Sequence, residues 1–147
     1  MDDVGDRVGH ATTLNNIGGV YYELGHLDKA LKFFNQALSI MPEVGDRDVM
    51  AITLRDIGDV YVALGQTDNA VEYYDQTLPI FDELDNIDDE VVIRTRISFI
   101  LFEHGNLKEA ETHLLRVVAL WEAGQSPSLE LDRETLAAVQ RRMSDQP

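Results

Sequence analysis

Histidines and acidic side chains are the residues of this sequence whose types could carry catalysis or hold a metal ion. His26 and His104 each stand beside a glycine at a predicted helix–turn junction, which favours ordinary surface positions for both. His113 follows Glu109 by four residues, so the two side chains share one face of a helix. This pair without a further ligand is a weak sign of zinc, which needs a larger set of protein ligands. We therefore predict no metal site.

The acidic segment DELDNIDDE, residues 82–90, has the composition of a calcium loop. An EF-hand loop needs oxygen ligands around a central glycine, and this segment has no glycine. A solvated connector, with Asp88 or Asp89 as the N-cap of the next helix, is the better interpretation. The glycines of NIGGVYYELG lie within a helical pattern, so they form no phosphate-binding loop. Without a catalytic constellation, we predict that the protein is not an enzyme and has no cofactor.

The charge of the chain limits its partners. Acidic residues outnumber basic residues 27 to 12, which gives a net charge of −15. Such a surface repels nucleic-acid phosphates and anionic lipids, so we predict neither a nucleic acid nor a membrane as partner. The acidic start MDDVGDRVGH lacks the basic and apolar regions of a signal peptide. Together with the absence of cysteine, these features predict a cytoplasmic protein.

One segment of the sequence occurs three times, with Gly18, Gly58 and Ser98 at corresponding positions 40 residues apart; the third copy is quoted from two residues further into the repeat. TLNNIGGVYYELGHLDKALKFFNQAL spans 13–38, TLRDIGDVYVALGQTDNAVEYYDQTL spans 53–78, and a more divergent copy, TRISFILFEHGNLKEAETHLLRVVAL, spans 95–120. Three sets of positions are identical in all copies: Ile17, Ile57 and Ile97, then Gly25, Gly65 and Gly105, then Ala30, Ala70 and Ala110. Repeats of this length indicate one supersecondary unit that stacks on copies of itself.

Each copy predicts two helices joined by a turn. In the first copy, apolar residues recur at helical spacing in two stripes: Leu14, Ile17, Gly18, Tyr21 and Leu24, then Leu27, Ala30, Leu31, Phe34, Leu38 and Met41. Gly25 between the stripes is the residue type that ends helices. Gly18 and Ala30 are small enough to let the two helices approach closely. Because one hairpin cannot bury both of its faces, the stacked copies must supply each other's core.

The pattern Leu-x-x-Ile-Gly-x-x-Tyr…Gly…Ala-x-x-x-Phe-x-x-Ala of the first copy resembles the tetratricopeptide repeat, and the second copy follows it with Tyr74 and Thr77 at the last two positions. The likeness covers residues 8–122 and is weaker in the third copy. The period of 40 exceeds the usual period of about 34. It is similar to that of kinesin-light-chain-like repeats and of repeat arrays in large bacterial signalling proteins. The resemblance implies an all-α, right-handed superhelix of three helix-turn-helix hairpins plus a C-terminal capping helix.

Three residues depart from the repeat. Arg94 stands where the other copies have leucine, so we expect its stem to lie along the core and its guanidinium to reach solvent or a carboxylate. Ser98 replaces the glycine of close packing. Pro79 lies within the second helix of the second copy, and its missing N–H predicts that the regular helix kinks or ends near Leu78.

The repeat pattern stops after Trp121. EAGQSPSLELD, residues 122–132, predicts a linker, and DRETLAAVQRRM predicts one more helix with Asp132 as its N-cap. Its apolar residues share one face, as a cap on a repeat array requires. The predicted organisation is three repeats within residues 1–124, at about 8–44, 48–84 and 88–122, followed by a linker and capping helix at 125–147.

In the tetratricopeptide family, the first helix of each repeat lines the concave face, so the resemblance implies a peptide-binding groove there. The inward positions that we select as this groove hold Asn15, Asn16, Tyr22, Arg55, Asp56, Asp59, Arg96 and Phe99. Amides there could bond a peptide backbone, arginines a carboxylate, and aromatic rings apolar side chains. In the alternative interpretation these residues serve only the fold: Arg55 pairs with Asp59 one turn on, and Phe99 packs against the C-terminal helix.

The repeat predicts a non-catalytic protein–protein interaction module that binds a peptide or a partner helix in this groove. The lysine–asparagine clamp of chaperone-binding members falls at Asn15 and Gly19, so we do not predict binding of a chaperone tail. Two alternatives stay open. One is a sensor or autoinhibitory segment of a larger bacterial signalling protein. GDRVGHATTLNNIG at the start has the sequence pattern of the connector and helix GDRDVMAITLRDIG that lead into the second copy, which suggests part of a longer array. The other is a scaffold that forms homo-oligomers through its N-terminal repeat.

Overall fold

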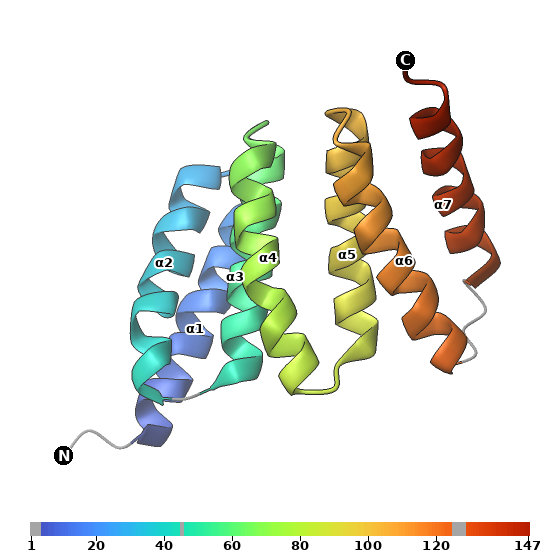
Figure 1. The fold of residues 1–147 in the computed structure, drawn as a ribbon. Helices are drawn as coiled ribbons and strands as arrows, with labels where there is room; N and C mark the ends of the chain where they lie inside the picture. Colours follow the sequence, from blue (N-terminus) through green and yellow to red (C-terminus); the bar gives the residue numbers. More distant parts are fainter. Residues whose placement is uncertain (1–3, 45, 125–128) are drawn as a thin grey trace. The chain divides into compact units, whose positions relative to one another are not determined.

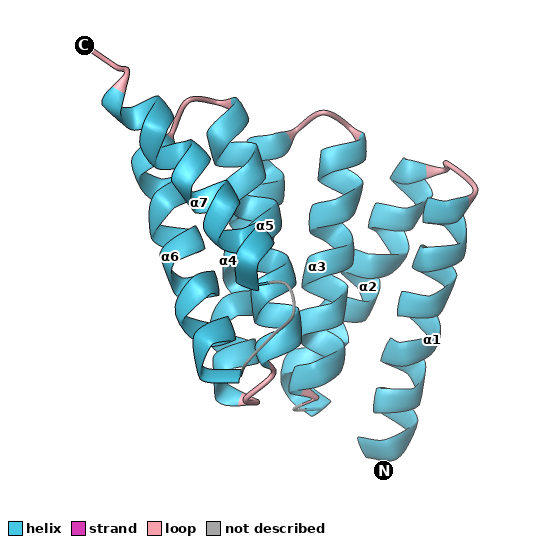
Figure 2. Ribbon diagram, turned by 90° about the vertical axis from the view of Figure 1, so that its right-hand side faces the viewer, coloured by secondary structure: helices cyan, strands magenta, loops and turns pink. Residues whose placement is uncertain are grey.

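The computed structural model describes residues 4–44, 46–124 and 129–147, and all regular structure within them is α-helical (Figure 2). Seven helices follow one another along these residues: α1 (Val4–Glu23), α2 (Leu27–Val44), α3 (Arg47–Ala63), α4 (Thr67–Glu83), α5 (Ile87–Glu103), α6 (Leu107–Gly124) and α7 (Leu129–Ser144). The predicted all-α class is confirmed. Within the described residues, none of these helices combines the length and the apolar character that a membrane crossing requires.

The chain divides into two compact units between Leu84 and Asp85. The first unit contains α1 to α4 and the second contains α5 to α7 (Figure 1). In the first unit, α1 pairs with α2, α3 pairs with α4, and α2 packs against α3. In the second unit, α6 packs against both α5 and α7. The helices thus form hairpins, in keeping with two stripes of apolar residues for each copy of the repeat.

Glycine closes the turn within each hairpin. The φ angles of Gly25, Gly65 and Gly105 are +78°, +73° and +79°, in the left-handed region where a Cβ is strained. At the first of these turns, the N–H of His26 donates to the carbonyl oxygen of Tyr21, and the N–H of Gly25 donates to that of Tyr22, each at 2.9 Å. This Schellman arrangement satisfies the last carbonyls of the helix. It explains why the three copies share a glycine at this position.

A second glycine in each of the first two copies lets the helices of the hairpin touch. A Cβ added to Gly18 would lie 2.6 Å from ring carbons of Phe34, and one added to Gly58 would lie 2.5 Å from the ring of Tyr74. Both rings are buried, with only 1% and 2% of their surfaces exposed. The aromatic side chain of the second helix therefore occupies the space that a larger residue on the first helix would need.

The third copy changes both partners of this contact together. Ser98 stands at the glycine position and Leu114 at the aromatic position, and both are buried. The larger residue on the first helix is thus matched by a smaller one on the second. The Ser98 hydroxyl donates to the carbonyl oxygen of Arg94 at 2.7 Å, so its polar atom is satisfied despite burial.

The helix through Pro79 does not end where the sequence predicts. α4 continues past Leu78 and Pro79 to Glu83, so of the two predicted alternatives, a kink or an end near Leu78, the end is wrong and the kink stays a prediction. Proline inside a helix removes one backbone donor and its ring crowds the carbonyl group four residues before it, which together cost about 3 kcal/mol. Ile80 and Phe81, directly after the proline, are 3% and 2% exposed. The burial of these two large side chains, at about 1.5–3 kcal/mol each, offsets that cost.

The N-caps also differ from the predicted ones. α5 begins at Ile87, and its N-cap is Asn86, whose side-chain oxygen accepts from the N–H of Asp89 at 3.2 Å. The predicted caps, Asp88 and Asp89, lie instead in the first turn, where a negative charge suits the helix dipole.

The last helix begins earlier than the sequence predicts. α7 starts at Leu129, so Asp132 lies in its first turn and is not its N-cap. Residues 125–128 of the predicted linker lie outside the described residues. Residues 122–124, also predicted as linker, belong to the end of α6.

The contact between Gly58 and Tyr74 predicts a large effect of a small substitution. We expect Gly58→Ala to lower the free energy of unfolding by about 1–3 kcal/mol, because the added methyl group meets a buried ring. Urea denaturation followed by circular dichroism measures this change.

Gly19→Ala is the matched control, since a Cβ at Gly19 would meet nothing within 4 Å. We expect this variant to gain about 0.5–1 kcal/mol from the better helix propensity of alanine. Adding Tyr74→Leu to Gly58→Ala should recover part of the lost stability, as the Ser98–Leu114 pair does in the third copy. Equal effects of the two glycine substitutions would contradict the packing argument.

Candidate functional site

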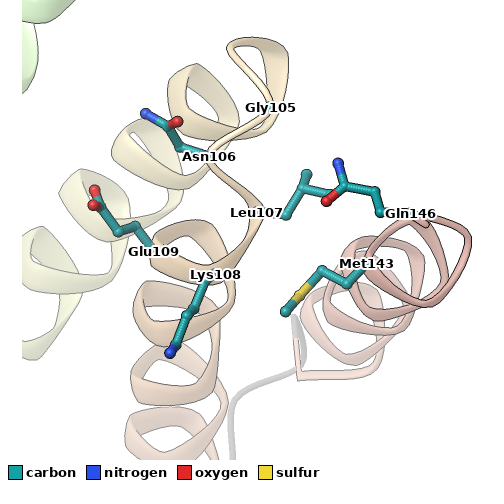
Figure 3. Close-up of a pocket in the computed structure, with 7 residues that line it drawn as sticks. All are labelled: Gly105, Asn106, Leu107, Lys108, Glu109, Met143 and Gln146. Atoms are coloured by element: carbon teal, nitrogen blue, oxygen red, sulfur yellow. The ribbon is translucent and has the colours of Figure 1, made fainter.

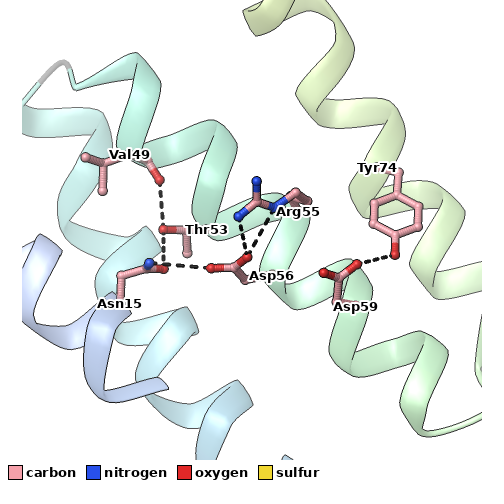
Figure 4. Close-up of polar contacts among 7 residues, drawn as sticks. All are labelled: Asn15, Val49, Thr53, Arg55, Asp56, Asp59 and Tyr74. Carbon is pink, nitrogen blue, oxygen red and sulfur yellow. Dashed lines mark hydrogen bonds and ion pairs between the residues drawn. The ribbon is translucent and has the colours of Figure 1, made fainter. Parts of the chain in front are cut away.

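Six of the eight predicted groove residues lie on the first helices of the first unit. We call this surface the α1–α3 face; it carries Asn15, Asn16, Tyr22, Arg55, Asp56 and Asp59. The structure brings Asn15 of α1 close to Asp56 of α3 (Figure 4). The Asn15 amide nitrogen donates to the Asp56 carboxylate at 3.5 Å. Positions 41 residues apart in the sequence thus meet on neighbouring helices.

Thr53 completes the contact between the two helices. Its hydroxyl lies 2.7 Å from the side-chain oxygen of Asn15 and 2.8 Å from the carbonyl oxygen of Val49. Thr53 is fully buried and Asn15 is 9% exposed. Asn15 therefore uses its amide to join α1 to α3, and little of it remains for a ligand. Sequence reasoning missed Thr53, although a threonine within the apolar stripe of α3 is the signal of a buried polar partner.

Arg55 covers the outer side of Asp56. Its Nε and Nη2 lie 3.3 Å and 3.1 Å from one carboxylate oxygen of Asp56. The two side chains are 29% and 22% exposed, so the ion pair is partly withdrawn from water. The alternative pairing of Arg55 with Asp59 is wrong, because Arg55 binds its direct neighbour in the sequence.

Asp59 lies one turn further along α3 and supports the core. The hydroxyl of Tyr74 on α4 donates to its carboxylate at 2.5 Å (Figure 4). A buried tyrosine needs a partner for its hydroxyl, and Asp59 provides it. The sequence held a signal for this bond: the first copy has Gly19 and Phe34 at these positions, so carboxylate and hydroxyl appear together in the second copy.

Burial controls the titration of Asp56. Loss of solvent raises the pKa of its carboxyl above the ordinary value of 3.8, and the nearby charge of Asp59 raises it further. The charge and hydrogen bonds of Arg55 oppose this shift, as does the hydrogen bond from Asn15. Because burial outweighs these opposing contacts, the pKa of Asp56 stays raised, and the protein compensates its negative charge only in part.

The other predicted groove residues are more exposed. Asn16 is exposed on α1, and Tyr22 exposes 37% of its surface. Arg96 and Phe99 belong to α5 in the second unit, where Arg96 is exposed and Phe99 exposes 66% of its surface. The α1–α3 face therefore gathers six of the selected residues, and α5 presents the remaining two within its own unit.

A buried ion cluster holds α5 to α6 in the second unit. Glu90 is 3% exposed and accepts from Arg94 Nε at 2.8 Å and from Arg116 Nε at 3.4 Å. The expectation that the Arg94 guanidinium reaches a carboxylate is confirmed. Its Nη1 also lies 3.2 Å from Nδ1 of His113, so that histidine contacts an arginine. Among the described residues, no group of three or more His, Cys, Asp or Glu side chains has the arrangement of a metal site.

A shallow pocket of about 340 Å³ lies beside the turn between α5 and α6 (Figure 3). Its lining residues are Gly105, Asn106, Leu107, Lys108, Glu109, Met143 and Gln146. A pocket of about 350 Å³ occurs beside the turn between α1 and α2, lined by Gly25, His26, Leu27, Asp28, Lys29 and Leu64. The same hollow lies at the same turn of two repeats, so it is a product of the hairpin geometry.

The sequence model of the tetratricopeptide repeat family matches residues 9–83, just over half of the chain. The chain belongs to the tetratricopeptide repeat family. Members of this family are protein–protein interaction modules, and the helical hairpins and mixed polar and apolar faces described above fit that class. No curated protein matches the chain.

Solved structures of similar fold include RapI in its apo form, which is 18% identical with a TM-score of 0.82. Aspartyl phosphate phosphatase F from Bacillus subtilis is 17% identical with a TM-score of 0.78. These two comparisons cover 95% and 88% of this chain but only 39% and 34% of those chains. The first tetratricopeptide domain of Spaghetti (RPAP3), bound to the HSP90 peptide SRMEEVD, is 15% identical with a TM-score of 0.69, covering 93% of this chain and 95% of that one. At these identities the likeness shows the fold alone.

The raised pKa of Asp56 predicts a specific response to substitution. Arg55→Gln should raise the pKa of Asp56 further, and Asp59→Asn should lower it, because these neighbours act in opposite directions. Titration of the carboxyl carbons by NMR measures both shifts. Arg47→Gln is the control, since Arg47 pairs with Glu83 and should leave Asp56 unchanged. An Asp56 that titrates at or below 3.8 in the wild type would contradict this account.

The same shift predicts a sign for the pH dependence of stability. The folded chain binds the Asp56 proton more tightly than the unfolded chain does. The contribution of Asp56 is therefore most favourable below its ordinary pKa of 3.8 and is lost as the pH rises through the higher folded pKa. We expect Asp56→Asn to remove this component of the pH dependence in denaturation series, and an unchanged profile would argue against it.

Proposed function

We propose that the chain is a non-catalytic module that binds an extended peptide or a partner helix on the α1–α3 face. The single observation that supports this most is the partly buried Arg55–Asp56 pair on the solvent side of α3. Burial leaves the charge of Asp56 incompletely compensated, and Asp59 adds a second carboxylate one turn away. A cationic side chain from a partner would form a charge-assisted hydrogen bond here, of the stronger class.

Exposed apolar side chains flank these carboxylates. On α3, Ile52 and Val62 expose 36% and 42% of their surfaces, and steps of 3 and 4 residues place them on the same helix face as Asp56 and Asp59. Tyr22 offers an aromatic ring on α1. Binding interfaces combine such apolar anchors with a few polar groups that fix orientation. We infer a peptide in which a lysine or arginine stands between apolar residues.

The proposed partner differs in charge from an acidic chaperone tail. Asn15 is committed to Asp56 and Thr53, and the residue one turn further, Gly19, has no side chain to donate. The face thus supplies carboxylates where an acidic peptide would need cations. Arg55 keeps its Nη1 for a peptide carbonyl, since Nε and Nη2 already bind Asp56.

A random peptide library displayed on phage tests this proposal, followed by calorimetry with the enriched peptide. We expect enrichment of sequences that carry Lys or Arg among apolar residues. Asp56→Asn should weaken binding about tenfold, the equivalent of ~1.4 kcal/mol. Glu72→Gln on the exposed side of α4 is the matched control and should bind like the wild type. No enrichment, or equal affinity for the wild type and Asp56→Asn, would reject the α1–α3 face as the site.

A second candidate function, self-association, has a specific observation in its favour. Val60 of α3 is fully buried in a core with Ala30, Phe34 and Ile57. Val20 holds the same position in the first copy but exposes 57% of its surface. The outer side of α1 thus repeats an apolar surface that the second copy buries. We propose that a second copy of the chain covers it.

Sedimentation velocity over a concentration series tests self-association. We expect the apparent mass of the wild type to rise with concentration, and Val20→Glu to abolish the rise by placing a charge in the contact. Val62→Glu is the matched control, because Val62 is an exposed valine on α3 (42% against 57% for Val20), and this variant should associate like the wild type. A wild type that stays monomeric at its highest soluble concentration would refute this second function.

A further inference from the structure

An apolar pocket lies within the second unit, apart from the α1–α3 face. Its volume is about 490 Å³, which falls within the range of small-molecule sites. The buried side chains Leu114 of α6 and Val139 of α7 line it. Phe99 and Phe102 of α5 and Leu131 of α7 line it as well.

The third copy of the repeat creates the space for this pocket. Leu114 stands where the first two copies carry Phe34 and Tyr74, so no aromatic ring lies beneath this part of α5. The first helix differs as well: Phe99 replaces the glycine and the aspartate of the first two copies. Leu114 on the second helix is smaller than the rings of the other copies, and Phe99 on the first helix is larger than its counterparts. Together they leave a hollow with an aromatic ring at its edge.

Polar contacts fix the position of α7, and one of them reaches Phe102 in the lining of the pocket. These are Arg133 with Glu122 at 2.7 Å, Gln140 with Glu111 at 2.8 Å, and Arg142 with the carbonyl oxygen of Phe102 at 3.1 Å. The guanidinium of Arg142 also lies over the ring of Phe102, 4.4 Å from its centre. The pocket therefore has walls held by bonds that a ligand need not disturb, which lowers the ordering cost of binding.

The exposed apolar residues at the pocket have no role in the core. Phe99 and Leu131 each leave 66% of their surface exposed. The prediction that Phe99 merely packs against the C-terminal helix does not account for this exposure. A ligand with an alkyl or aryl body would cover both side chains and gain from their removal from water.

The polar groups of the pocket select the other end of the ligand. The hydroxyls of Ser98 and Thr135 donate to the carbonyl oxygens of Arg94 and Leu131 at 2.7 Å and 2.9 Å, so they face the pocket as acceptors. Glu134 is the only charged side chain that lines it, and among the described residues it has no ion-pair partner. An acceptor set with one carboxylate suits a ligand that carries a donor and a positive charge.

We propose that this pocket binds a small amphiphilic amine, with its alkyl or aryl body between α5 and α7 and its ammonium group at Glu134. The apolar residues supply the affinity for the body. Glu134, assisted by the hydroxyl oxygens of Ser98 and Thr135, supplies the preference for the cation. The site needs no residue of the first unit, so it is independent of the peptide-binding function proposed above.

Three probes of matched shape test the proposal on the full chain: phenylbutylamine, phenylbutanol and phenylbutyrate. Binding is measured by NMR, from chemical-shift changes of assigned backbone amides. We expect the amine to bind about tenfold more tightly than the alcohol and the carboxylate to bind most weakly, as one charge-assisted hydrogen bond implies. The shifts should concentrate on residues 95–102 of α5 and 131–139 of α7.

Two substitutions, each with a matched control, assign the effect to the pocket. Glu134→Gln should reduce the affinity for the amine to that for the alcohol, whereas Glu109→Gln, outside this pocket on α6, should change neither. Ala138→Phe should fill the pocket and abolish binding of all three probes, whereas Ala137→Phe at the next position of α7 should not. If Ala138→Phe fails to fold by circular dichroism, the shift map and Glu134→Gln decide alone.

Other outcomes would overturn the proposal. Equal affinity for the amine and the alcohol would show that Glu134 does not select a cation. The pocket would then recognise only an apolar group, such as an apolar side chain of a partner protein. Shifts confined to the first unit would place the amine elsewhere. Absence of saturable binding of the amine by the wild type would show that the pocket takes no ligand of this class.

Discussion

The close approach of the two helices of a hairpin at Gly18 and Gly58 is the constraint on which the rest of the structure depends. Each glycine leaves room for a buried ring on the second helix, and the ring fills the hairpin. Where the ring is Tyr74, its hydroxyl needs an acceptor, so Asp59 appears on the exposed side of α3. Where the pair becomes Ser98 and Leu114, the ring is absent, and both residues line the pocket of the second unit. The same packing position thus contributes one residue, Asp59, to the α1–α3 face and two residues to the pocket.

The sequence predicts the parts of the fold that depend on periodicity and on residue size. Apolar stripes and the repeated turn glycines locate the helices of the three copies. A left-handed turn residue and a close helix contact each allow few other backbone conformations. Helix ends follow weaker rules. α4 passes through Pro79 because the burial of the side chains after it offsets the cost of the proline. Asn86 is the cap because α5 starts at Ile87, two residues earlier than a cap at Asp88 would require, and several nearby side chains could have served as cap.

The sequence predicts which helix faces carry the residues of the candidate site, but not which of these side chains bind one another. Spacing places Asn15, Arg55 and Asp56 on exposed first-helix faces, but it does not say which of them meet. Arg55 has two carboxylates within reach, that of Asp56 next to it in the sequence and that of Asp59 one turn away. It binds Asp56. Sequence reasoning misses Thr53 because the burial of its side chain depends on packing against the neighbouring repeat. The apolar periodicity of one helix does not show that packing. Pairing of side chains is therefore a tertiary result, settled by packing between α1 and α3.

The two candidate sites lie in separate units of the chain, and both have more acceptors than cations. With 27 acidic and 12 basic residues, most cations that the structure describes near these sites are already bound by carboxylates or carbonyl oxygens, as Arg55, Arg94 and Arg142 are. What remains at both sites is a surplus of acceptors: Asp56 with Asp59 on the α1–α3 face, and Glu134 with two hydroxyl oxygens in the pocket of the second unit. Partly buried acceptors gain more from a cation than exposed ones, because less water competes. The proposed selection of positively charged, partly apolar ligands agrees with the acidic composition of the chain. We expect it to weaken with added salt most strongly at Glu134, which is more exposed than Asp56.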